Sequence, residues 1–206
     1  MIENSPTTDG AIDKLRIEHA VREILTAVGQ DPEGEDVLET PRRVAEAYSE
    51  LFQGLAKDPL RHLDVTFNED YREMIVIRDI PFHSVCAHHL LPFFGKAHVG
   101  YLPTGRVIGL SKLARVVEDY AKRPQLQERL TAQVADALHR GLESEGSMVV
   151  IEAHHLCMAI RGVQKQGATT ATRAVRGEFE EDAERRREAM SLIMNNTEET
   201  DYPLLP

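Results

Sequence analysis

The spacing of apolar residues predicts two helices near the start of the chain. Between Ala11 and Val28, apolar side chains recur at near-helical intervals, and Gly29 provides a C-terminal stop. A second helix starts at Thr40-Pro41, with Thr40 as its N-cap and Pro41 in the first turn, and ends near Gly54. We expect residues 1–64 to form an N-terminal tail and helical extension.

Strands and helices follow in an order typical of the α+β class. Residues 74–80 are rich in β-branched side chains and predict a strand, and residues 95–103 and 106–110 predict a pair of strands joined around Thr104-Gly105. Helices are expected from Ser111 and after Pro124, strands over 148–160 and 168–177, and a charged helix over 179–194. This order predicts an antiparallel sheet with two covering helices over residues 65–196, and a C-terminal tail over 197–206. Bare sheet edges favour pairing between subunits, so we expect an oligomer.

Composition narrows the possible functions. The 206-residue chain has a net charge of −10, which argues against a general binder of nucleic acid or of membrane surfaces. A local basic pocket for a small anion remains compatible with this charge. The sequence has no apolar run of the ~20 residues that cross a membrane, and its N-terminus lacks the pattern of an export signal. We expect a cytoplasmic protein.

Both cysteines of the chain lie beside histidines, in Cys86-Ala87-His88-His89 and His154-His155-Leu156-Cys157. Thiolate and imidazole are preferred zinc ligands. One tight turn can bring Cys86 and His89 to a single ion, and Cys157 supplies a third ligand. Three protein ligands leave the fourth position open, as in catalytic sites. A disulfide between the cysteines, or two inert buried cysteines, are the alternatives.

Two further histidines are candidates for proton transfer. If residues 148–160 form one strand, His155 and Cys157 face the same side and His154 the other. His155 then lies one strand step from the metal, where an imidazole can act as general acid or base. The alternatives are a fourth zinc ligand or a core histidine. His88 is a second catalytic candidate, or else a hydrogen-bond donor that fixes its loop.

Polar residues at predicted helix starts suggest an anion site. Gly109-Leu110-Ser111-Lys112 joins a strand to a helix, whose free N–H groups suit phosphate, and Arg115 adds charge. Arg161 and Lys165 follow the second cysteine segment and can complete such a pocket. Gln127 and Glu128 offer an amide and a carboxylate of the kind that a guanine edge requires. On residue type alone, each of these is more often a solvated surface residue.

Four segments resemble the signature blocks of GTP cyclohydrolase I: 86–93 (CAHHLLPF), 109–115 (GLSKLAR), 123–130 (RPQLQERL) and 157–162 (CMAIRG). Their order and spacing match as well, and the resemblance covers about Leu15 to Asn195. It implies a tunnelling fold (T-fold), in which small sheets from several subunits close into a barrel. It also implies a homodecamer of two stacked pentamers with active sites at subunit interfaces.

The resemblance also implies roles for individual residues. Cys86, His89 and Cys157 correspond to zinc ligands, His155 to the proton donor of the purine ring, and His88 and Ser111 to groups that assist the ribose steps. Glu128, with Gln127, corresponds to the guanine anchor, and the set that binds ribose and triphosphate comprises Leu110, Ser111, Lys112, Arg115, Arg161 and Lys165.

The implied reaction opens the guanine imidazole ring of GTP by hydrolysis, releases formate and gives 7,8-dihydroneopterin triphosphate, the first step of pterin and tetrahydrofolate biosynthesis. The alternatives are a specialised relative that stops at the ring-opened formamide and a zinc-stabilised protein that binds nucleotide without turnover. One position departs from the family pattern: the usual block reads Cys-Glu-His-His, and this chain has Ala87 in the second place.

Overall fold

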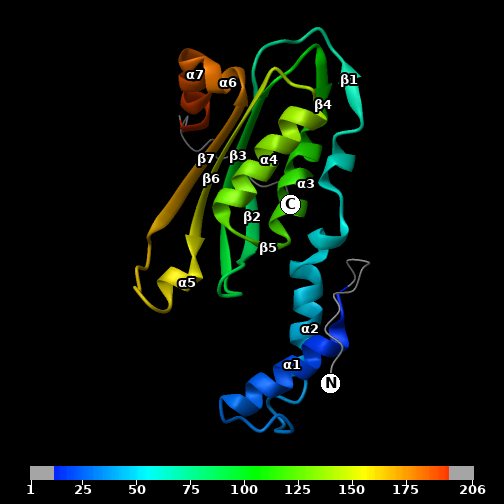
Figure 1. The fold of residues 1–206 in the computed structure, drawn as a ribbon, viewed down its shortest axis with the longest axis vertical. Coiled ribbons are helices and arrows are strands. Elements are labelled where there is room, and N and C mark those ends of the chain that lie inside the picture. The colour runs from blue at the N-terminus through cyan, green and yellow to red at the C-terminus, as the bar shows by residue number, and fades with distance from the viewer. Residues whose placement is uncertain (1–11, 195–206) are drawn as a thin grey trace, which may run out of the picture.

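The computed structural model describes residues 12–194, so the proposed tail 197–206 and the first residues of the N-terminal segment lie outside it. Helices α1 (Lys14–Ala27) and α2 (Thr40–Leu51) form a hairpin that projects from the rest of the chain (Figure 1). Thr40 is the first helical residue and not the N-cap that we expected, because the Glu39 carbonyl accepts the first intrahelical hydrogen bond, from the Arg43 N–H at 3.0 Å. The boundary between residues 64 and 65 stays a prediction.

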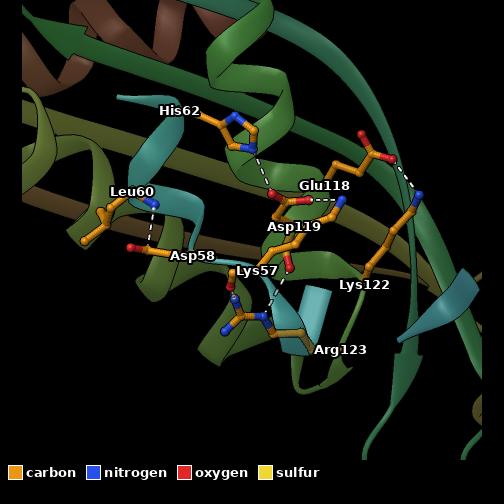
Figure 2. A network of polar contacts seen from close by, with 8 residues as sticks. All are labelled: Lys57, Asp58, Leu60, His62, Glu118, Asp119, Lys122 and Arg123. Atoms are coloured by element: carbon orange, nitrogen blue, oxygen red, sulfur yellow. Dashed lines mark hydrogen bonds and ion pairs between the residues drawn. The ribbon is translucent and has the colours of Figure 1, made fainter. Parts of the chain in front are cut away.

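Two short 3₁₀ helices, η1 (Gln53–Ala56) and η2 (Pro59–His62), connect this hairpin to the body. A polar network holds them against α3 (Leu110–Ala121) (Figure 2). The buried Asp119 carboxylate accepts from Lys57 Nζ at 3.0 Å and lies 2.7 Å from His62 Nε2. The extension is therefore tied to the body by buried polar contacts.

The main sheet has the strand order β5-β2-β3-β6-β7. Its four long strands are antiparallel neighbours, with bounds β2 (Ile75–Cys86), β3 (Pro92–Leu102), β6 (Gly146–His155) and β7 (Thr169–Gly177). The two-residue β5 (Pro124–Gln125) pairs in parallel with the end of β2, which the sequence did not predict. The sheet is thus antiparallel except at this edge.

We expected strand β4 (Arg106–Ile108) to pair with β3, but the structure does not show this pairing. Both edges of β3 are occupied by β2 and β6, so β4 has no free edge there. It pairs instead with β1 (Thr66–Asn68) in a separate two-stranded sheet.

Helices α3 and α4 (Gln127–Gly141) cover one face of the main sheet, which confirms the two covering helices. The core between them contains Val116, Leu130, Val134, Phe93 and Ile151, all fully buried. Helix α3 begins at Leu110 after Gly109, so the strand that we expected to reach Leu110 ends at Ile108. The result is an α+β fold, as predicted.

The opposite face is partly covered as well, which the sequence pattern did not predict. Helices α6 (Glu178–Glu181) and α7 (Ala183–Met194) pack there in a second core around Met148 and Phe179. The single helix predicted over 179–194 is broken at Asp182. The extended backbone of Asp182 ends α6, and its carboxylate accepts from the N–H groups of Glu184 and Arg185. Within residues 12–194, every helix is too short or too polar to cross a lipid bilayer.

The strand predicted over 148–160 ends at His155, and the next residues form the short helix α5 (Leu156–Ala159). The last pair between β3 and β6 is Phe93 with His155, and the residue before Phe93 is Pro92. Because proline has no N–H to donate, the ladder cannot continue toward Leu156. The prediction that one strand carries both His155 and Cys157 is therefore wrong.

Candidate metal centre and active site

Three side chains from two distant segments of the sequence converge at one end of the main sheet. One possible ligand atom from each of Cys86, His89 and Cys157 lies within 4.8 Å of the others, and Cys86 Sγ is 3.8 Å from His89 Nδ1. Ligand atoms around a tetrahedral zinc ion lie about 3.3–3.8 Å apart, given bond lengths of ~2.0–2.3 Å. Both cysteines are free thiols in the structure. The donor types and their spacing therefore fit a metal ion.

Cys86 and His89 are held by a tight turn between β2 and β3. The Leu90 N–H donates to the Cys86 carbonyl at 2.8 Å, and the Cys86 N–H donates to the Leu91 carbonyl at 2.9 Å. Strand β5 supports the turn from outside, because the Ala87 N–H donates to the Gln125 carbonyl at 2.9 Å. The three-residue spacing thus brings both ligands to one point.

Cys157 reaches the same point from α5. Burial, followed by the nearby thiol of Cys86, raises the pKa of the Cys157 thiol. Two adjacent thiols resist joint ionisation, and a divalent cation between them removes that penalty because thiolate is the ligating form. The electrostatics of the site therefore match a cation.

His155 lies at the end of β6, beside the cluster in sequence but not part of it. Its ring stacks on Phe93 at 4.7 Å between centroids, and its Nε2 lies 2.7 Å from Gln127 Oε1. Burial lowers the pKa of His155, and the charge of Glu128 opposes this shift. His154 lies next to Phe94, on the other side of the strand, and is exposed. The prediction that His154 and His155 face opposite sides of the strand is confirmed. The position of Cys157 relative to His155 is set by helix α5 and not by strand alternation.

Several predicted residues surround the cluster on exposed loops. His88 belongs to the same turn as His89, with its ring edge-on at 6.2 Å between centroids. The charge of Arg161 reaches Cys157 and favours its thiolate. The Lys165 N–H donates to the Met158 carbonyl, which keeps the loop after α5 close to that helix. The charge of Arg161 therefore acts near the candidate metal centre, and the backbone at Lys165 is held close to α5.

Leu110, Ser111, Lys112 and Arg115 lie elsewhere, on the first turns of α3. The other end of α3 is the one near the metal turn, because Ser84 Oγ donates to the Ala121 carbonyl at 2.6 Å (Figure 1). Ser111 and Ala121 are ten residues apart, or about 15 Å along the helix axis. The single chain does not bring these residues to its own metal centre.

Glu128 and Gln127 begin α4 and differ in environment. Glu128 is exposed, whereas Gln127 is buried and its amide bonds to β6, β7 and His155. Sequence reasoning missed the link from Gln127 to His155 and the support that Phe93 gives the ring. The only sequence signal was a polar residue at a helix start followed by the buried spacing of Leu130 and Val134.

Comparison with known proteins gives a consistent result. The family model described as GTP cyclohydrolase I matches residues 17–194. A relative from Bacillus pumilus, named GTP cyclohydrolase 1, is 55% identical over 90% of this chain and 98% of its own length. Proteins of the same name from Carboxydothermus hydrogenoformans and Mycolicibacterium gilvum are 57% and 58% identical, each over 88% of this chain and over 95% and 91% of their own lengths. This chain therefore belongs to the GTP cyclohydrolase I family of enzymes.

Proposed function

We propose that this protein is a zinc-dependent GTP cyclohydrolase I, which hydrolyses GTP to formate and 7,8-dihydroneopterin triphosphate in the first step of pterin and tetrahydrofolate biosynthesis. The observation that carries the proposal is the convergence of Cys86, His89 and Cys157 at the end of the sheet where a partly buried, hydrogen-bonded His155 lies. Family membership over almost the whole chain supports the same reaction.

Cys86, His89 and Cys157 would hold the zinc ion, which supplies Lewis acidity and activates water near neutral pH. His155 exchanges a proton with the purine ring, because its ring is fixed in plane by Phe93 and at Nε2 by Gln127. His88 and Ser111 assist the ribose steps. Glu128 accepts from the guanine edge, and the cationic side chains of Lys112, Arg115, Arg161 and Lys165 bind the triphosphate.

We further propose that the active site is shared between copies of the chain in a homo-oligomer of the T-fold type, most simply a decamer. The separation of Ser111 and Lys112 from the metal centre along α3 supports this, because one GTP molecule must contact both groups. Apolar side chains on the projecting hairpin, such as Leu15, Ile24 and Val28, are exposed in the single chain and also suit subunit contacts.

Incubation of the zinc-loaded protein with GTP tests the reaction, with formate and the fluorescence of oxidised neopterin as readouts. Both signals support the proposal. Loss of GTP without either signal indicates arrest at the ring-opened formamide, and unchanged GTP indicates a binding protein. Cys157→Ser is expected to lose most of its zinc, whereas His155→Ala is expected to keep zinc and lose ring opening. Unchanged zinc in Cys157→Ser would contradict the ligand set.

Co-expression of two inactive variants tests the shared site. Cys157→Ser and Lys112→Ala are each expected to be inactive, and random mixing gives about a quarter of the sites both native halves if the halves come from different chains. Recovery of activity near that fraction supports the shared site, and no recovery contradicts it. Light scattering on the same samples measures the assembly size.

A further inference from the structure

The side chain of Gln127 is buried and its amide orientation is determined by its surroundings. Only 2% of the residue is exposed. Its Nε2 lies 3.0 Å from the Ile151 carbonyl, 2.9 Å from the Thr170 carbonyl and 3.1 Å from Thr172 Oγ1. A backbone carbonyl only accepts hydrogen bonds, so the NH₂ group and not the oxygen of the amide must face these atoms. The amide oxygen therefore faces His155.

Two threonines reinforce this orientation. Thr131 Oγ1 donates its single proton to the Gln127 carbonyl at 2.7 Å. The 2.7 Å contact between the two hydroxyls must then use the proton of Thr172, which leaves Thr172 Oγ1 as an acceptor for Gln127 Nε2. The hydrogen bonds form a closed, directed ring from the Gln127 amide through Thr172 and Thr131 back to the Gln127 backbone. Reversing the amide would break this ring of hydrogen bonds. It would also place the amide oxygen, which cannot donate, against the three atoms that accept from Nε2.

The orientation fixes the state of the histidine. Gln127 Oε1 has no hydrogen, so His155 Nε2, at 2.7 Å, must carry one. The neutral ring is then the Nε2–H tautomer. The stacked Phe93, with an interplanar angle of 2°, holds the ring plane.

We propose that Gln127 is a positioning residue that holds His155 as its Nε2–H tautomer and so makes Nδ1 the nitrogen that exchanges a proton with the substrate. This inference rests on the proposed function for its catalytic consequence. In that reaction, Nδ1 first takes up a proton from water to form the imidazolium and then gives it to the purine ring. The Nε2 proton stays on His155, hydrogen-bonded to Gln127 Oε1, so the imidazole returns to the same neutral tautomer. Gln127 acts through His155, while contact with the guanine edge is left to Glu128.

The principal variant is Gln127→Met, which keeps a similar length and removes both polar atoms. We expect kcat to fall roughly 10- to 100-fold with KM for GTP and zinc content little changed, because the imidazole loses its orientation and not its ligand neighbours. A rise in KM at unchanged kcat would show direct substrate contact instead and overturn the proposal.

Ser147→Ala is the matched control. Ser147 is also buried and also joins β6 to α4, through a 2.8 Å bond to the Ala135 carbonyl, but it lies away from His155. Its loss should lower stability and leave kcat unchanged. If kcat falls as far in Ser147→Ala as in Gln127→Met, the effect is a general loosening of α4 against the sheet and the positioning role is wrong.

A spectroscopic measurement separates this inference from the proposed function. In zinc-loaded protein labelled with ¹⁵N at histidine, solid-state NMR distinguishes the protonated from the unprotonated ring nitrogen, and the His155 signals are identified by their loss in His155→Asn. We expect the Nε2–H tautomer in the native protein and a mixture in Gln127→Met. A native Nδ1–H tautomer would overturn the proposal even if GTP is consumed. A native protein that leaves GTP intact contradicts the proposed function, whereas the tautomer still decides the role of Gln127.

Discussion

Asp119 offers a quantitative test of how the helical extension is held to the body. The side chain is 5% exposed, and its two oxygens contact Lys57 and His62 (Figure 2). Asp119→Ala removes both contacts at once. Breaking a buried ion pair costs about 3–5 kcal/mol when the surviving charge stays buried. Lys57 is 44% exposed, so its ammonium group returns to water and that full penalty does not apply.

The remaining loss comes mainly from the bond to His62, whose side chain is 23% exposed. A hydrogen bond to a charged group contributes about 1.5–3 kcal/mol, and a pair as exposed as that of Lys57 adds at most ~1 kcal/mol. We therefore expect Asp119→Ala to lower the free energy of unfolding by about 2–3 kcal/mol. Backbone amides of η1 and η2 should lose hydrogen-exchange protection before those of the sheet, because these turns lose their anchor first.

Urea denaturation at a fixed protomer concentration measures the change as a shift in midpoint at constant slope. Glu118→Ala is the control, because Glu118 is the preceding residue of α3 and its pair with Lys122 is 54% exposed at the carboxylate. That variant should stay within about 0.5 kcal/mol of the native protein. Equal midpoints for the two variants would refute the reasoning. They would show that the contacts of Asp119 contribute no more to the free energy of unfolding than the exposed pair of Glu118 and Lys122 does.

Three further predictions concern the sheet and the metal turn. Gly95→Ala should destabilise the protein by about 3 kcal/mol, because the added Cβ would lie 1.9 Å from the Glu152 carbonyl oxygen across the central strands. Gly109→Ala, where the nearest atom is 3.8 Å away, is the control in thermal unfolding. Burial lowers the pKa of His98, with Asp79 and Glu152 opposing and Lys96 and Arg78 assisting. The unfolded chain therefore binds a proton that the fold does not, so stability should fall as the pH drops below about 6.5, and His98→Gln should flatten this dependence in urea titrations at several pH values. If a carboxylate at this position supports the ligands, Ala87→Glu should strengthen zinc retention or raise GTP turnover by up to ~10–100-fold. No change in zinc retention or in turnover would mean that the turn functions equally well with alanine.

Local pattern was enough to predict much of this protein. The helical spacing of Leu113, Val116 and Val117 and that of Leu130 and Val134 predicted α3 and α4, and both pack on the sheet as expected. The position of each cysteine beside histidines indicated the candidate metal centre, because ligand chemistry depends on residue type and a three-residue turn is a local structure. These features required no knowledge of which segments meet in space.

Other features depended on contacts between distant segments. The pairing of β4 with β1 follows from the occupation of both edges of β3, and the end of β6 at His155 follows from the lack of an N–H in Pro92 on the neighbouring strand. The function of Gln127 likewise depends on Ile151, Thr170 and Thr172, which the fold brings to one amide. The sequence by itself determined which residues have ligand and core chemistry, because that is a property of side-chain type and local spacing. Only the tertiary structure decided which strands pair, where they end and which nitrogen of His155 carries the proton, because a hydrogen bond exists only once both of its partners have been brought together.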